Sequence, residues 1–198
     1  MRVLRSADYR RMPWKNGGGE TREVAVSPPG ATLDTLDWRL SLATVASDGP
    51  FSVFAGVVRT LCVLEGAGIS LDVAGSGKQV LLCSSAPDTF NGEAATNALL
   101  VDGPIVDLNV MSRRGRFRHT VERYVGVGRH ELKSSAEISI VFCVNGEASC
   151  TADSVTSQLH PGDCAILDEP QPPLRLEAAQ TMDLLVIELY REFAGSGI

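Results

Sequence analysis

Apolar and polar residues alternate along most of this chain, and that period of two restricts the fold more than any other feature. In segment 37–46, DWRLSLATVA, the apolar Trp38, Leu40 and Leu42 alternate with smaller or polar residues. Successive side chains of a strand point to opposite faces, so the pattern is typical of β-strands with two unlike faces. Many short segments of this kind, among them FSVF (51–54), LRLEA (174–178) and DLLVIELY (183–190), are separated by Gly, Pro, Asp and Ser clusters. This predicts an all-β fold without long helices.

Two parts of the chain resemble each other. RTLCVLEGAGISL resembles SIVFCVNGEASCT, and VDLNVMSRR resembles LLVIELYRE, at nearly equal separations along the sequence. This duplication predicts two barrels: the first over residues 1–115, with an N-terminal glycine-rich loop, and the second over residues 116–198. We expect one compact unit in which strands can exchange between the barrels. The basic segment RRGRFRHTVERYVG would then be a solvated crossover between them.

The two copies differ in their polar residues. Arg59, Asp107 and Asn109 lie on predicted strands of the first copy, and the alignment matches them with Ser139, Leu185 and Ile187 in the second. Buried polar groups cost free energy unless they are hydrogen-bonded. The first copy therefore has either a solvent-exposed strand face or a polar cavity at these positions. In the second case, the first copy holds a binding site and the second is a scaffold.

Composition and charge argue against several partners. The net charge is −6, which disfavours nucleic acid and anionic membranes, and the basic run at 113–118 has no recognition module around it. The first twelve residues carry four arginines where a signal peptide needs an apolar core. No apolar run is long enough to span a bilayer. We therefore expect a cytoplasmic protein without a membrane or nucleic-acid partner.

Motifs for metal, nucleotide or nucleophilic chemistry are missing. The three histidines are isolated in the sequence, and the five cysteines form no CxxC pair and lie mostly in apolar runs typical of buried thiols. KNGGGET lacks the lysine that follows the glycines of a phosphate-binding loop, and no GxSxG segment is present. The expectation is that there is no metal, cofactor or catalytic nucleophile.

Four motifs carry a resemblance to a known family. PWKNGGGETREV, WRLSLATVASDGPFSVFAGVVRTLCVLEGAG, FNGE and DGPIVDLNVMSRRG, in that order, closely resemble the HutD/Ves family over about Met12 to Gly115. The C-terminal half is similar only to a generic cupin repeat, through LHPGDCAILD. The resemblance implies a bicupin, that is, two fused cupin barrels of the double-stranded β-helix or jelly-roll type. It also implies a cytoplasmic regulator associated with histidine-utilisation genes, although some members are named for stress responses.

Metal-dependent cupins hold their ion with an HxHxxxE cluster and a further histidine. At the corresponding place this chain has RTLCVLEG, which keeps Glu65 without the histidines. This departure from the pattern of metal-dependent cupins supports the expectation that no metal binds.

A small carboxylate is the ligand that the remaining residues favour. Arg59 is the first choice because a guanidinium matches a carboxylate with two parallel hydrogen bonds. Lys15 and Asn16 are expected to reach over the first barrel from the glycine-rich loop, unless that loop is slack chain. The other candidate site residues are Trp14, Thr21, Arg39, Ser41, Phe51, Asp107, Asn109 and Arg113, with Phe54 as a further apolar wall. Structural roles stay open for them, such as an Arg39–Asp107 ion pair in the scaffold.

Three functions remain. The first is a non-enzymatic regulator that senses a small anionic metabolite such as N-formyl-L-glutamate or urocanate. The second is a metal-independent isomerase or hydrolase of a formylated or cyclic amino-acid derivative, with Asp107 or Glu65 as general base. The third is a structural protein that forms a homodimer through edge strands.

Overall fold

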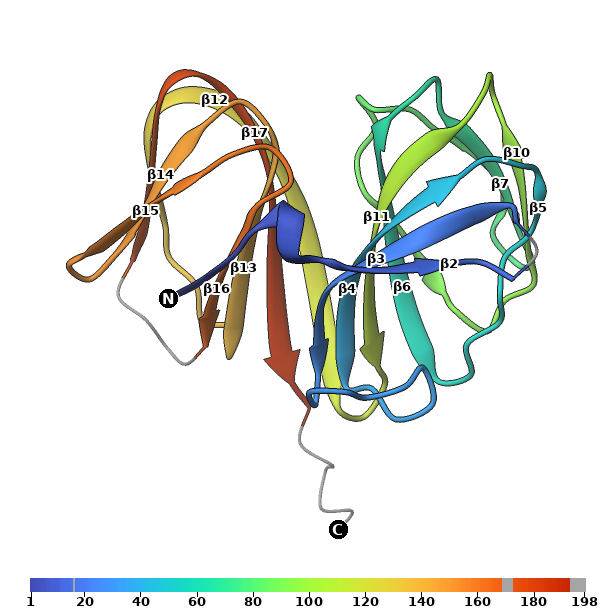
Figure 1. The fold of residues 1–198 in the computed structure, drawn as a ribbon. Coiled ribbons are helices and arrows are strands. Elements are labelled where there is room, and N and C mark those ends of the chain that lie inside the picture. The colour runs from blue at the N-terminus through green and yellow to red at the C-terminus, as the bar shows by residue number, and fades with distance from the viewer. Residues whose placement is uncertain (16, 169–172, 193–198) are drawn as a thin grey trace, which may run out of the picture. The chain divides into compact units, whose positions relative to one another are not determined.

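The computed structural model describes residues 1–15, 17–168 and 173–192, and strands dominate it (Figure 1). A single 3₁₀ turn, η1 (Ser6–Asp8), is the one helical element among these residues. The structure divides into two compact units. The larger unit holds Arg10–Arg118 and Glu192, and the smaller unit holds Met1–Tyr9 and His119–Arg191.

The larger unit consists of two sheets. The six-stranded sheet has the order β2 (Arg10–Pro13), β3 (Gly19–Ser27), β4 (Trp38–Val45), β11 (Ile105–Arg113), β6 (Val57–Glu65) and β9 (Asp88–Asn91). The four-stranded sheet has the order β5 (Gly49–Pro50), β10 (Thr96–Leu100), β7 (Ile69–Val73) and β8 (Gly77–Leu81). One apolar cluster joins the two sheets and includes Leu61, Val63, Ile69, Leu71 and Ala98. The core of this unit therefore lies between its sheets.

The smaller unit is built on one seven-stranded sheet. Its order is β1 (Arg2–Leu4), β16 (Cys164–Asp168), β13 (Ile138–Asn145), β17 (Leu174–Arg191), β14 (Ala148–Ala152) and β15 (Val155–Leu159), and β12 (Phe117–Leu132) also pairs with β17. Its core contains three buried cysteines, Cys143, Cys150 and Cys164. Burial raises the pKa of each of these thiols to about 12, as expected for inert structural cysteines.

Two sequence-based element assignments were wrong, and one strand was not predicted. The basic segment after Arg116 forms most of β12, a strand of 16 residues, along which the chain passes from the larger unit to the smaller one after Arg118. Two predicted strands at 174–178 and 183–190 are parts of one 18-residue strand, β17. Segment 51–54, predicted as a strand, has no regular structure.

The duplication is visible in the strand pairing, with a register that differs from the predicted one. Antiparallel β6 and β11 correspond to antiparallel β13 and β17. Asp107 pairs with Val63, and the equivalent of Val63, Cys143, pairs with Leu184. The same comparison matches Asn109 with Val186. The counterparts are thus Leu184 and Val186 rather than Leu185 and Ile187, and the register irregularity lies at the equivalent place in both strand pairs.

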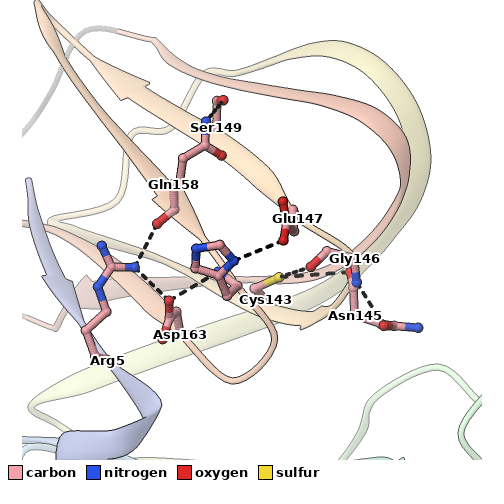
Figure 2. Close-up of polar contacts among 9 residues, drawn as sticks. Arg5, Cys143, Asn145, Gly146, Glu147, Ser149, Gln158 and Asp163 are labelled. Atoms are coloured by element: carbon pink, nitrogen blue, oxygen red, sulfur yellow. Dashed lines mark hydrogen bonds and ion pairs between the residues drawn. The ribbon is translucent and has the colours of Figure 1, made fainter.

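The N-terminal strand β1 is held by a buried carboxylate from the distant part of the chain (Figure 2). Arg5 Nη1 donates to Asp163 Oδ2 at 2.7 Å and to the Gln158 carbonyl oxygen at 2.8 Å. The backbone N–H groups of Ser6 and His160 also donate to the Asp163 carboxylate. Burial acts to raise the pKa of Asp163, but these hydrogen bonds outweigh it and keep that pKa below its ordinary value. Asp163 therefore ties residues 1–9 to the smaller unit.

Within the described part of the chain, no helix is long and apolar enough to cross a membrane.

We expect Asp163→Ala to lower the free energy of unfolding by about 3 kcal/mol at neutral pH, since it strips three donors of their charged acceptor. Because the pKa of Asp163 is lowered in the folded state, the difference should shrink as the pH falls through that pKa, below the ordinary value of 3.8. Urea unfolding at several pH values measures both effects. Asp8→Ala, at an exposed carboxylate of the same segment, is the control and should change little.

Candidate functional site: a buried arginine in a polar pocket

The larger unit contains a pocket of about 750 Å³. It is lined from β4, β6 and β11, from the chain that joins β2 to β3, and from segment 50–54. Of the residues predicted for the site, Trp14, Lys15, Thr21, Arg39, Ser41, Phe51, Arg59, Asp107 and Asn109 line it. Asn16 lies outside the described residues. The polar face of these strands thus borders a cavity rather than bulk solvent.

Arg59 is the buried cation of the pocket. Its residue exposure is 7%, its Nε donates to Asn109 Oδ1 at 2.6 Å, and its guanidinium carbon lies 4.4 Å from the centre of the Phe51 ring. Neither Nη1 nor Nη2 donates to any residue in the described ranges. Burial lowers the pKa of Arg59 to about 10 against the opposing effect of Asp107, so the side chain stays charged at neutral pH.

Asp107 and Asn109 follow each other on one face of β11. Asn109 Nδ2 donates to Asp107 Oδ1, while Asp107 Oδ2 has no hydrogen-bond partner among the described residues. Asp107 is fully buried. Burial raises the pKa of Asp107 to about 7, although Arg59 and the hydrogen bond from Asn109 act to lower it. A carboxyl group that titrates near neutral pH therefore borders the pocket.

The second pocket arginine is already paired. Arg39 Nε donates to Glu23 Oε2 at 2.9 Å, so its ion-pair partner is Glu23 and not Asp107. Ser41, two residues further along β4, is buried at 2% exposure. The third cation of the pocket lining, Lys15, is exposed. Among the described residues, Arg59 is therefore the buried pocket cation without a direct ion pair.

The three glycines of KNGGGET form a tight turn that holds Trp14 at the pocket wall. The Trp14 N–H donates to the Gly19 carbonyl at 2.9 Å, and Trp14 Nε1 donates to Thr21 Oγ1 at 2.8 Å. A Cβ on Gly19 would lie 2.0 Å from the Thr44 carbonyl oxygen and 3.1 Å from the Trp14 ring, so only glycine fits there. Gly17 has a φ of +72° and open space around it. Gly17 and Gly19 are thus hydrogen-bonded to Trp14 at the pocket wall, and they do not lie in slack chain.

Arg113, another predicted site residue, does not line the pocket. Its guanidinium donates to the carbonyl oxygens of Leu36 at 2.8 Å, Asp34 at 2.8 Å and Leu33 at 3.0 Å. It therefore fixes the loop between β3 and β4, from which Leu33 reaches the pocket.

Sequence reasoning missed several apolar lining residues: Met12, Pro13, Leu33, Ala43, Val45, Pro50 and Met111, together with Ser52. Met111 could have been found, because it continues the face of Asp107 and Asn109 by one more period of two. Ala43 and Val45 likewise continue the face of Arg39 and Ser41 on β4. The others lie on a loop or at strand ends, where alternation gives little signal. Among the described residues, no group of three or more His, Cys, Asp or Glu side chains could hold a metal ion.

The HutD family model matches residues 6–186. The chain belongs to the HutD family. An uncharacterised 21.2 kDa protein in the hutC 3′ region of Pseudomonas putida is 36% identical over 178 residues, which cover 89% of this chain and 92% of that protein. Protein Ves of Cronobacter sakazakii is 39% identical over 146 residues, or 70% of this chain and 75% of Ves.

Solved structures give the same family and the fold. HutD from Pseudomonas fluorescens (formate condition) is 32% identical, with a TM-score of 0.82 over 96% of this chain and 98% of that one. A cupin 2 conserved barrel domain protein from Leptotrichia buccalis, 12% identical with a TM-score of 0.54 over 85% of this chain and 87% of that one, shares the fold alone. The prediction of an all-β, cupin-like fold is confirmed, while one cupin barrel per half of the chain stays a prediction.

Gly19→Ala should destabilise this HutD-family protein by roughly 3 kcal/mol, because its Cβ would collide with backbone that pairs β3 with β4. Gly17→Ala meets no atom and should cost only about 1–2 kcal/mol, from the left-handed backbone conformation. Urea unfolding with tryptophan emission as the probe compares the two. Equal losses would contradict the packing role of Gly19.

Asp107→Asn should change the pH dependence of stability. Between the ordinary value of 3.8 and about 7, folded wild-type Asp107 keeps a proton that the unfolded chain releases, so wild-type stability falls as pH rises through this window. Asparagine does not titrate. In this window the free energy of unfolding of the variant, relative to wild type, should therefore rise by up to about 1.4 kcal/mol per pH unit. Thermal unfolding from about pH 4.5 to 7.5 measures this, with the exposed Asp72→Asn as control. Parallel curves for wild type and Asp107→Asn would refute it.

Proposed function

We propose that this protein is a non-enzymatic binder of a small carboxylate that serves as a metabolite sensor in histidine utilisation. One observation carries the binding proposal: a buried, charged Arg59 borders a pocket of about 750 Å³ and leaves both terminal nitrogens without a described protein acceptor. A desolvated guanidinium without an ion-pair partner favours a ligand that supplies the missing negative charge.

The pocket around Arg59 suits such a ligand in size and composition. Phe51, Phe54 and Trp14 provide apolar walls, and Ser41 and Lys15 add donors. A volume of this order accommodates a small organic anion with several carbon atoms. Phe51 also stacks on the guanidinium and keeps its plane in place. This arrangement supports a metabolite carboxylate rather than a bare inorganic ion.

Family membership supports the biological setting. The Pseudomonas putida relative lies in the hutC 3′ region, and a solved relative is named HutD. N-formyl-L-glutamate and urocanate are the two ligands that we propose to test first. Both carry a carboxylate for Arg59 and further atoms for the apolar walls.

A metal-independent hydrolase or isomerase is the second candidate. The observation that favours it is Asp107, whose pKa of about 7 and partnerless Oδ2 would suit a general base. Among the described lining residues, no other carboxyl group and no histidine accompanies Asp107, Arg59 stays charged at neutral pH, and Arg39 is held by Glu23. Glu65 is exposed outside the lining. We therefore favour binding without turnover.

Arg59→Met should weaken the binding of N-formyl-L-glutamate or urocanate by about tenfold to a hundredfold, because a charge-assisted hydrogen-bond pair is lost while an unbranched apolar stem is kept. Isothermal titration calorimetry at about pH 6.5 measures the affinity, and NMR of the recovered ligand detects any product. Arg114→Ala removes an equal charge from a surface pair with Glu93 and should bind as wild type does.

Three other outcomes would each contradict one claim of the proposal. Unchanged affinity in a folded Arg59→Met protein would show that the site is wrong. Conversion of the ligand would replace the sensor by the enzyme. If wild type binds neither compound, the two proposed metabolites are wrong, and a thermal-shift screen of other small carboxylates then decides whether any carboxylate binds.

A further inference from the structure

We propose that Asp107 takes part in binding as a protonated carboxylic acid, whose Oδ2–H donates to the ligand carboxylate, so that the pocket takes up one proton together with its anion. This inference rests on the proposed function and adds to it a ligand-binding role for Asp107. It also makes affinity depend on pH.

The hydrogen-bond chain from Arg59 fixes where that proton can sit. Arg59 Nε can only donate, so the atom of Asn109 that faces it must be the oxygen Oδ1. The amide nitrogen of Asn109 is thereby turned toward Asp107 and donates to its Oδ1. Since Oδ1 already accepts, a proton on the carboxyl group belongs on Oδ2. That oxygen is buried and has no partner among the described residues, and Asp107 is one of the residues that line the pocket.

The surroundings of Asp107 disfavour its ionised form. The residues paired with it on the two neighbouring strands, Ala43 on β4 and Val63 on β6, are apolar. The charged side chains nearest on the packed elements are Arg59 on β6, which acts through Asn109, and Arg39 on β4, which Glu23 of β3 neutralises.

The other charged groups are more remote from Asp107. Lys15 borders the pocket from an exposed position, and Glu65 is exposed at the end of β6. Asp88 on β9 is half-buried outside the pocket lining, and burial also raises its pKa, which makes it a useful control. Arg59 is therefore the main charge that keeps Asp107 partly ionised near neutral pH.

Ligand binding removes that influence. A carboxylate beside Arg59 compensates the guanidinium charge and adds a second negative charge near Asp107, and both effects favour the protonated acid. One ligand oxygen then accepts from Arg59 and the other from Asp107 Oδ2–H. The proton comes from solvent, and no covalent bond to carbon forms or breaks. By linkage, a proton taken up on binding means that affinity falls as pH rises.

Calorimetry with formate, which carries a carboxylate and no other binding group, tests the inference. Titrations at about pH 6 and about pH 8, each in two buffers of different ionisation enthalpy, give the number of protons taken up. We expect little uptake at about pH 6, uptake approaching one proton at about pH 8, and an affinity about tenfold lower at the higher pH. Asp107→Asn, which keeps an N–H donor, should bind without proton uptake and with an affinity independent of pH. Asp88→Asn should behave as wild type does.

A direct readout follows the carboxyl group itself. In protein labelled with ¹³C-aspartate, the resonance that Asp107→Asn removes belongs to Asp107, and its titration midpoint should move upward by about two pH units when formate is added. This measurement does not depend on the heat of a weak binding reaction.

The outcomes separate this inference from the proposed function. If wild type binds formate, Arg59→Met does not, and no proton is taken up at about pH 8, the carboxylate site stands and the role of Asp107 is refuted. Proton uptake that persists in Asp107→Asn also refutes it. If neither formate nor the larger carboxylates bind to wild type, the proposed function itself fails.

Discussion

The contact of Arg59 with Asn109 organises the candidate site, since it holds a cation inside a β-structure. A guanidinium in this position costs desolvation free energy, which the hydrogen bond to Asn109, the Phe51 ring and the nearby Asp107 charge offset only in part. The remaining deficit lies at its two terminal nitrogens. In the folded protein these two nitrogens therefore lack hydrogen-bond acceptors, and a ligand that supplies negatively charged acceptors fits the pocket.

The smaller unit has the same strand arrangement without a buried cation. Its positions equivalent to Asp107 and Asn109 are Leu184 and Val186, and its core is filled by apolar side chains and inert thiols. Packing of this kind stabilises a sheet without any ligand. Because the two strand pairs are alike in topology, the polar residues of the larger unit are not required by the fold.

Much of this could be predicted from the sequence, and the failures have physical reasons. Arg59, Asp107 and Asn109 were found because period two fixes which side chains share a face, and polar groups on such a face need a cavity or solvent. Arg113 was placed in the pocket because it is close in sequence, but its long side chain caps loop carbonyls instead. The long strand β12 was missed because charged residues and glycines obscure its alternation. The predicted register of β17 was wrong by one residue because the continuous apolar run at 184–187, LLVI, fits either register.

Two buried polar atoms lack partners within the described residues, and the contrast between them argues that Asp107 is functional. Trp38 Nε1 lies on the face of β4 opposite to Arg39 and Ser41, away from the pocket lining, so its unmet donor costs stability without offering a site. Asp107 Oδ2 carries a similar penalty, but Asp107 lines the pocket together with Arg59, whose two terminal nitrogens have no acceptor among the described residues. A ligand carboxylate can satisfy both groups at once, provided that Asp107 holds a proton. A single unsatisfied atom is a local defect. Arginine donors without acceptors and a titratable acid that line the same pocket, in contrast, are together complementary to a carboxylate ligand.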